Sequence, residues 1–195
     1  MNGLLGKALA APIVNVLDTP AYEESGYQKP FDCEGTTGVP VHLIQNGRLE
    51  GLLHHCESAQ QLGQQPTGNA GRTAGLVKGV SRIITPRSLV MQPGNISVDE
   101  LLKQLENGYY IFDAWDEFHA VNVASGDFHF PCSAVRIEHG QRVGVIEGLT
   151  FSGNIREFLP EITALGRDLC FMPLLMHETY QVAAPAVLVS EAHLS

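Results

Sequence analysis

The chain has 195 residues, of which 44% are hydrophobic and 17% charged, a balance that excludes a disordered protein. Its formal net charge is −9, and its 12 lysines and arginines are scattered, so the sequence predicts no direct binding to nucleic acid. No apolar run is long enough to predict a membrane span. We therefore expect a cytoplasmic protein whose four cysteines are reduced.

The sequence of the first half of the chain predicts short strands and turns. A strand is expected over 13–17, followed by a surface loop over 21–30. Asn46-Gly47 separates two apolar segments, 41–45 and 48–53, and this pair predicts a type I′ hairpin because both turn positions need positive φ.

The next part of the chain contains a predicted helix and a predicted long loop. A short helix is expected over 57–62, ending at Gly63, and residues 64–79 are expected to form a loop rich in Gly, Gln and Thr. A strand is expected within 80–90, interrupted at Pro86.

Two capping patterns predict helices in the second half. Ser97 and Glu100 form a capping box that opens a helix ending by Gly108. Asn154 and Glu157 suggest a second box, opening a helix to Leu165 that Pro160 should kink. The remaining expected strands cover 109–114, 118–124, 126–130, 134–138, 141–146 and 186–189, with His139-Gly140 as a hairpin turn.

These elements predict an α+β fold that is β-rich, with largely antiparallel sheets, hairpins and two or three short helices. We expect one domain over 1–195. Exposed strand edges favour a dimer that covers them.

The histidines and cysteines do not form a recognisable metal motif. His54-His55-Cys56 is the densest cluster, but neighbouring side chains diverge, so we expect one packed and one exposed ring. His177-Glu178 lacks a second histidine one turn on and is expected in a surface loop. His119 and His129 are interpreted as a structural pair.

Other residues are weak candidates for binding. Asp32 and Glu34 could form a carboxylate pair, but a turn closed by Gly35 and capped by one carboxylate is the favoured interpretation. Two Gly-Asn pairs, Gly68-Asn69 and Gly153-Asn154, are αL or capping positions whose amides could also bind a peptide backbone. We expect no catalytic residue in this chain.

Several motifs in order resemble the C-terminal region of the TldD/PmbA family, peptidase-related proteins also called modulators of DNA gyrase. The resemblance extends over about residues 4–189. The motifs that carry it are Phe31-Asp32-Cys33-Glu34-Gly35-Thr36, Pro66-Thr67-Gly68-Asn69-Ala70, Val121-Asn122-Val123-Ala124-Ser125-Gly126-Asp127-Phe128 and Phe151-Ser152-Gly153-Asn154-Ile155-Arg156. The Val121–Phe128 segment looks closer to the PmbA (TldE) branch. Family chains are more than about twice as long, and their N-terminal half is absent from this sequence.

The resemblance implies zinc in metal-bearing relatives, held by a His-Glu-x-x-x-His helix that this sequence does not contain. A late cysteine completes that ligand set, which makes Cys170 a low-probability metal candidate, although its surroundings differ from the family pattern. We therefore expect no cofactor in this chain, and the resemblance leaves open whether it is an enzyme.

Three hypotheses follow from the sequence. The favoured one is a non-catalytic subunit or substrate-holding domain of a metallopeptidase assembly. It would bind a peptide or an unfolded protein segment by strand addition, as a homodimer or as a heterodimer with a related subunit. The alternatives are a structural or protein-interaction module without a peptidase role and a self-sufficient zinc metallopeptidase.

Overall fold

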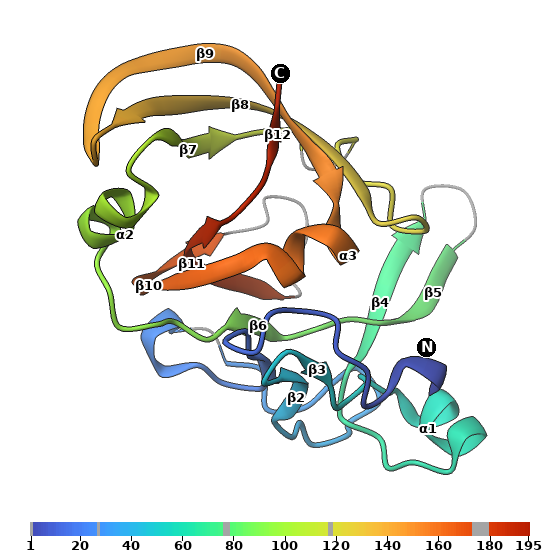
Figure 1. Ribbon diagram of the computed structural model, residues 1–195. Coiled ribbons are helices and arrows are strands. Elements are labelled where there is room, and N and C mark those ends of the chain that lie inside the picture. Colours follow the sequence, from blue (N-terminus) through green and yellow to red (C-terminus); the bar gives the residue numbers. More distant parts are fainter. Residues whose placement is uncertain (1, 27, 76–78, 117–118, 173–179) are drawn as a thin grey trace. The chain divides into compact units, whose positions relative to one another are not determined.

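The computed structural model describes residues 2–26, 28–75, 79–116, 119–172 and 180–195 (Figure 1). The chain divides into two compact units. Unit 1 comprises Met1–Lys7, Asn15–Gln92 and Leu169–Ala184, and unit 2 comprises Ala8–Val14, Pro93–Asp168 and Pro185–Ser195. The expectation of a single domain stays a prediction.

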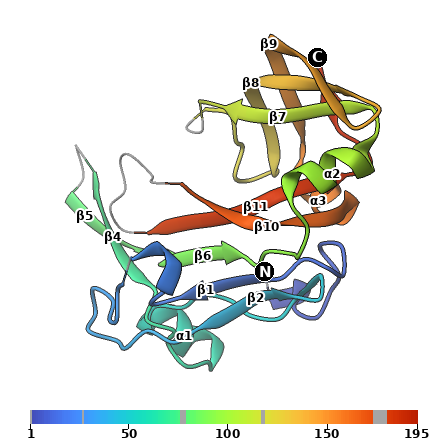
Figure 2. The ribbon, with the colours of Figure 1, turned by 90° about the vertical axis from the view of Figure 1, so that its left-hand side faces the viewer.

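Unit 1 is built on a sheet whose central strand is β1 (Val16–Thr19), which begins later than the expected 13–17. Figure 2 shows β1 between β2 (Val41–Gln45) and β6 (Ser88–Met91), and both pair with it in antiparallel fashion. β11 (Gln181–Val189) adds to β6 in parallel through Gln181–Ala183. With β10 (Ile162–Met172) and β3 (Arg48–Leu49) at the two edges, the full strand order is β10-β11-β6-β1-β2-β3.

The turns of unit 1 follow the predicted chemistry. Asn46 and Gly47 have φ values of 49° and 75°, so the hairpin between β2 and β3 (Arg48–Leu49) is confirmed. The helix α1 spans Cys56–Leu62, and Gly63 ends it in the left-handed region, also as predicted. A short 3-10 helix, η2 (Glu23–Ser25), lies in the predicted surface loop.

The predicted loop over 64–79 is confirmed over 64–69 and wrong from Ala70 on, while residues 76–78 lie outside the described residues. β4 (Ala70–Gly75) pairs with β5 (Gly79–Ile84) along its whole length in an antiparallel two-stranded sheet. Small residues, Ala70, Gly71 and Ala74, supply no apolar alternation, so the pattern gave no strand signal, yet their backbone groups pair normally. Pro86 separates β5 from β6, as expected.

Unit 2 contains a four-stranded sheet in the order β12-β9-β8-β7. Figures 1 and 2 show β7 (Gly108–Ala114), β8 (Asp127–Glu138) and β9 (Gln141–Asn154) side by side. All neighbours are antiparallel, and the two-residue strand β12 (His193–Leu194) pairs with β9 only at Phe151 and Ser152. The predicted turn at His139-Gly140 is confirmed, with φ values of 49° and 72°.

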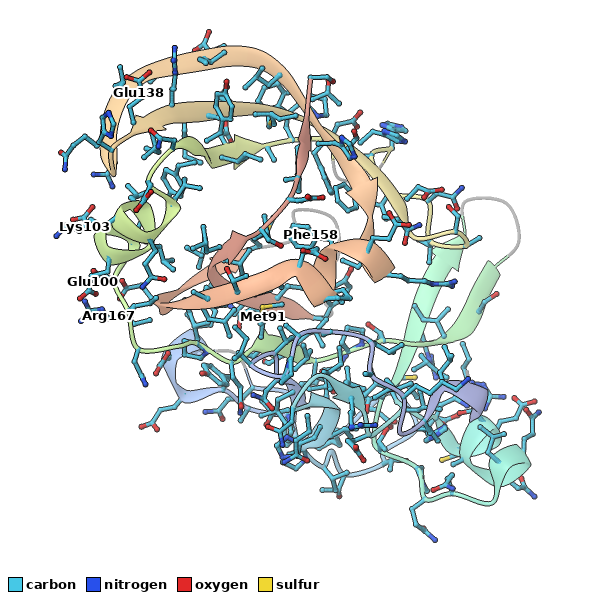
Figure 3. All side chains as sticks on the ribbon, viewed as in Figure 1. Met91, Glu100, Lys103, Glu138, Phe158 and Arg167 are labelled. Atoms are coloured by element: carbon cyan, nitrogen blue, oxygen red, sulfur yellow. The ribbon has the colours of Figure 1, made fainter. Side chains whose placement is uncertain are left out.

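Helix α2 (Val98–Leu105) of unit 2 begins with the predicted capping box. The Ser97 hydroxyl accepts from the Glu100 N–H at 3.3 Å, and the Glu100 carboxylate accepts from the Ser97 N–H at 2.7 Å. Leu101 and Leu102 are buried. Glu100 also lies 3.6 Å from the guanidinium of Arg167, and the two are seen together in Figure 3.

Two predictions for unit 2 are wrong. Residues 119–124 form turns with one isolated bridge, Val121 to Phe128, because Asn122 and Asp127 close a tight loop before β8 begins. Residue 118 of that predicted strand lies outside the described residues. The predicted strands 126–130 and 134–138 are one strand, β8.

The predicted helix from Asn154 to Leu165 is also wrong beyond its first turns. It consists of α3 (Ile155–Phe158) and the 3-10 turn η3 (Leu159–Glu161), and then β10 (Ile162–Met172) begins. Asn154 caps the start by accepting from the Arg156 N–H at 2.9 Å, without a reciprocal bond from Glu157. Pro160 cannot donate a helical hydrogen bond, and the β-branched residues Ile162 and Thr163 favour a strand after it.

The fold class is confirmed as α+β and β-rich, with largely antiparallel sheets and three short helices. β10 and β11 are divided between the units, at Asp168 and at Ala184. Among the described helices, none has the length and apolar character needed to cross a bilayer.

Candidate functional site

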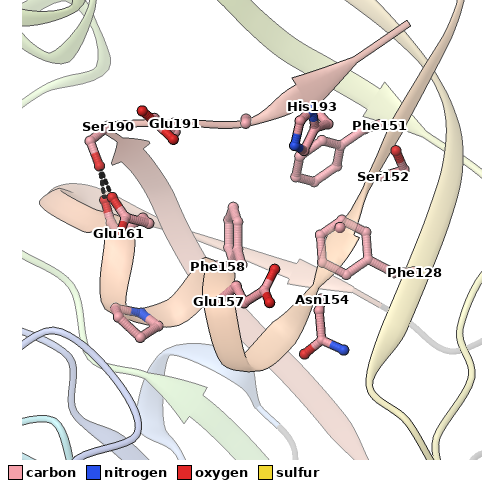
Figure 4. A pocket seen from close by; sticks show the side chains of 13 residues that line it. Phe128, Phe151, Ser152, Asn154, Glu157, Phe158, Glu161, Ser190, Glu191 and His193 are labelled. Carbon is pink, nitrogen blue, oxygen red and sulfur yellow. Dashed lines mark hydrogen bonds between the residues drawn. The ribbon is translucent and has the colours of Figure 1, made fainter.

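A cavity of about 740 Å³ lies within unit 2 (Figure 4). The end of β9, the turn formed by α3 and η3, and the segment that leads into β12 surround it. Its lining residues are Phe128, Phe151, Ser152, Gly153, Asn154, Glu157, Phe158, Pro160, Glu161, Ser190, Glu191, Ala192 and His193.

Aromatic rings form one wall of this cavity. The centroids of Phe128 and Phe151 are 5.0 Å apart, and Phe158 meets them edge-on at 6.0 Å and 5.8 Å. Edge-to-face contacts at these distances stabilise a cluster beyond the area it buries. The cluster therefore gives the pocket a firm apolar wall.

Carboxylates form the polar part of the lining. Glu157, Glu161 and Glu191 are all exposed, and the described lining contains no lysine or arginine. The Ser190 hydroxyl donates to the Glu161 carboxylate, and the Ser190 N–H donates to the Glu161 carbonyl at 3.1 Å. Glu161 is thus held in place, and Glu157 and Glu191 are exposed at the same pocket.

One predicted Gly-Asn pair lies in this pocket. Asn154 donates to the Asp127 carboxylate at 2.7 Å and to the Ser125 carbonyl at 3.1 Å, which ties the pocket to the turn before β8. Hydrogen bonds from Ser125 and Asn154 lower the pKa of Asp127. A Cβ at Gly153 would lie 2.9 Å from the Phe128 ring, so glycine lets β9 pass close to the aromatic wall.

The other predicted pair, Gly68-Asn69, lies in unit 1 and is part of a buried polar network. The Asn69 amide donates to the Asp18 carboxylate at 2.7 Å and to the Thr85 carbonyl at 3.0 Å. Gly68 has φ of 73° and packs against the backbone of Gly38. The structure therefore places the two Gly-Asn pairs in different units and does not bring them together, and their role in binding stays a prediction.

Asp32 and Glu34 do not act as a carboxylate pair but hold separate parts of unit 1. Asp32 accepts from the N–H groups of Glu34 and Thr36, so the predicted capped turn is confirmed. Glu34 accepts from the Cys56 N–H at 2.9 Å and from Arg82 at 2.7 Å. These contacts, the Cys56 hydrogen bond first, lower the pKa of Glu34 to about 2.

The histidines have structural roles that the sequence did not show. His54 is buried, as the expectation of one packed ring required, and burial lowers its pKa. His55 is half-buried and caps α1, because its Nδ1 accepts from the Ser58 N–H at 3.0 Å. His119 binds Asp116 at 2.6 Å. His177-Glu178 lies outside the described residues.

The described residues do not fit a zinc site. In the ranges that the structure covers, no three His, Cys, Asp or Glu side chains gather as a metal ion would require. Cys170 is an exposed residue of β10. Whether the chain carries a metal stays a prediction.

The outer edge of β9 is a second candidate surface of unit 2. β8 pairs with β9 along its length, but on the other side the described chain covers only Thr150–Ser152, through Ser195 and β12. The edge from Gln141 to Leu149 is therefore open in the described structure. Val143 and Val145 on this stretch are 57% and 61% exposed.

Comparison with known proteins decides the family. Residues 1–195 match the family model described as the PmbA/TldA metallopeptidase C-terminal domain. The chain belongs to this family. The resemblance of the motifs to TldD/PmbA proteins is thereby confirmed.

Relatives of this TldD/PmbA domain are named as metalloproteases. A metalloprotease of Methanothermobacter thermautotrophicus is 30% identical over 169 residues, which are 86% of this chain and 36% of the relative. The zinc metalloprotease TldD homolog of Saccharolobus solfataricus is 28% identical, over 86% of this chain and 38% of the relative.

A solved structure of the TldD/PmbA family has the same fold. The Thermotoga maritima protein TM0727, which is named for modulation of DNA gyrase, superimposes with a TM-score of 0.84 at 30% identity. The match covers 99% of this chain and 41% of TM0727. The chain thus spans about two fifths of the length of these relatives.

Proposed function

We propose that this chain is the substrate-holding, non-catalytic part of a TldD/PmbA-type metallopeptidase assembly. It binds an extended peptide or an unfolded protein segment and presents it to a metal-bearing subunit. The proposal includes the cytoplasmic location and the pairing with a second copy or a related subunit that the sequence led us to expect. The family membership and the metalloprotease names of the relatives support the peptidase context.

The open edge of β9 is the observation that carries the proposal. Thr150 and Ser195 exchange backbone hydrogen bonds at 2.8 Å and 3.1 Å, so the chain's own terminal segment already adds to this edge as an antiparallel strand. A peptide laid along Gln141–Leu149 would continue the same line and satisfy the next backbone groups. This is β-strand addition, in which main-chain hydrogen bonds supply affinity.

Zinc would have to come from outside the described part of this chain. A zinc ion held by a partner subunit would supply Lewis-acid chemistry for peptide hydrolysis. The residues described here do not fit that ion, so no catalytic step is assigned to them.

Fluorescence anisotropy with a labelled peptide tests the proposed function. The probe is an extended peptide of about eight alternating valines and threonines, with lysine at its centre. Methylation of its central backbone nitrogens removes two or three main-chain bonds of about 1 kcal/mol each and should weaken binding about 30- to 100-fold. Equal affinity of both peptides, or no binding of either, contradicts the proposal.

Metal content provides the second test. Elemental analysis of the purified chain after dialysis without chelator should find far less than one zinc per chain. About one tightly bound zinc per chain would instead favour a self-sufficient metallopeptidase.

A further inference from the structure

We propose that the unit 2 pocket between β9, α3–η3 and β12 binds a basic side chain, lysine or arginine, of the peptide. This inference rests on the proposed function, because the peptide carries the cation. It adds a preference of the pocket for a side chain that has an aliphatic stem and a positive charge at its end.

The charge of the pocket selects a cation. Glu157, Glu161 and Glu191 contribute three carboxylates to the lining. Among the described lining residues no lysine or arginine neutralises them, and His193 is the one histidine. An acidic ligand would be repelled here, whereas an ammonium or guanidinium group gains complementary contacts.

The aromatic wall selects the stem. Phe128, Phe151 and Phe158 present an apolar surface on which the methylenes of lysine or arginine can lie while the charged head reaches the carboxylates. A cation near the face of an aromatic ring is also attracted by the ring's negative potential. The cavity of about 740 Å³ also has room for the residues that flank the basic one.

Figure 4 shows the aromatic rings and the carboxylates around the same pocket. Phe128 belongs to β8 and Phe158 to α3, and Glu157 and Glu161 extend from the α3–η3 turn. Glu161 is fixed by Ser190, so one carboxylate is preorganised before a ligand arrives.

The pocket is within reach of a peptide on the open edge of β9. Ser152 lines the pocket, and the open edge begins three residues earlier in the strand, at Leu149. At the rise of a β-strand this is roughly 10 Å. A peptide that leaves the edge at Leu149 can therefore place a long basic side chain toward the pocket.

Three versions of the probe peptide test the inference by anisotropy, with lysine, norleucine or glutamate at the centre. Norleucine keeps the aliphatic stem of lysine and removes the charge. At about pH 8 and low salt, where histidines are largely neutral, the lysine peptide should bind about tenfold more tightly than the norleucine peptide. The glutamate peptide should bind more weakly than either.

A double variant, Glu157→Gln with Glu191→Gln, locates the preference. It should remove most of the tenfold advantage of lysine and leave the affinity of the norleucine peptide within about twofold. Asp113→Asn, which removes one exposed carboxylate on β7 outside the pocket, is the control and should keep the lysine preference.

The outcomes separate the two proposals. Peptides that bind without regard to the central residue overturn the pocket inference and leave the proposed function standing. A lysine preference that survives the double variant, or disappears equally in Asp113→Asn, also overturns the inference, since overall charge would then explain it. Failure of every peptide to bind overturns both.

Discussion

Asp18 and Asn69 meet in the interior of unit 1, where the Asn69 amide donates to the Asp18 carboxylate at 2.7 Å across 51 residues of sequence. The same carboxylate accepts from the Arg87 N–H at 2.7 Å and lies 3.5 Å from the Arg87 guanidinium. Asp18 is 0% and Asn69 1% exposed. Burial raises the pKa of Asp18 even though these partners oppose the shift.

Loss of the Asp18 carboxylate should therefore destabilise the fold strongly. Asp18→Ala removes a buried carboxylate that lies beside the buried Arg87 guanidinium and should lower the free energy of unfolding by about 3–5 kcal/mol, measured by urea denaturation. Asp99→Ala removes an exposed partner of Arg142 and should cost less than about 1 kcal/mol. Similar effects of the two substitutions would contradict this role for Asp18.

Gly38 allows Arg87 to occupy its buried position. A Cβ at Gly38 would overlap the guanidinium of Arg87, so Gly38→Ala should lower the free energy of unfolding by about 2 kcal/mol or more. Gly144→Ala places a methyl group in open space on β9 and should change stability by less than about 1 kcal/mol. Thermal unfolding of both variants compares them, and an unchanged Gly38→Ala protein would show that Arg87 can move aside.

Glu34 makes stability depend on acid. Its folded pKa of about 2 is below the ordinary value of 4.5, so its stabilisation is fully present above pH 4.5 and is lost as the pH falls toward 2. Allowing for solvent around Arg82, this amounts to about 1 kcal/mol. Urea denaturation between these pH values should show that the free energy of unfolding depends less on pH in Glu34→Gln than in the unmodified protein. The same dependence on pH in the two proteins would refute the assignment.

The site of strand addition can be tested on the two edges of the unit 2 sheet. In the part of the sheet that the structure describes, the outer edge of β7 and the Gln141–Leu149 stretch of β9 pair with no other strand, and Tyr109 and Val143 are exposed on them. Val143→Asp should weaken binding of the norleucine version of the probe peptide about tenfold, because it places a charge along the proposed line of the peptide. Tyr109→Asp should leave the affinity for the peptide within about twofold. The reverse result would indicate that the peptide binds at β7.

Sequence reasoning found the elements whose signals are local. Positive φ at Asn46-Gly47, the Ser97 capping box and the capped turn at Asp32 are all specified by a few neighbouring side chains. The sequence did not predict strand β4, because its small residues show no alternation of apolar and polar side chains. Its pairing with β5 depends on hydrogen bonds along the backbone. The helix predicted from Asn154 was too long, because β10, which follows it, is stabilised by pairing within a sheet that the local sequence does not reveal.

The pocket was only partly predictable. Gly153-Asn154 was singled out, and the structure places it in the lining. Glu161 and Glu191 belong to segments separated by β10 and β11, and no spacing in the sequence relates them. The capping role of His55 had no signal either, since histidine is an uncommon N-cap residue.

The turn at Asp32 has a consequence for hydrogen exchange. One carboxylate holds the amides of Glu34 and Thr36 in its own loop and that of Ala70, 38 residues away in β4. The protection of these three amide protons depends on hydrogen bonds to a side-chain carboxylate rather than on hydrogen bonds to backbone carbonyls. They should therefore exchange with solvent as a group, at one shared rate set by the release of Asp32, although they lie on separate segments of the chain.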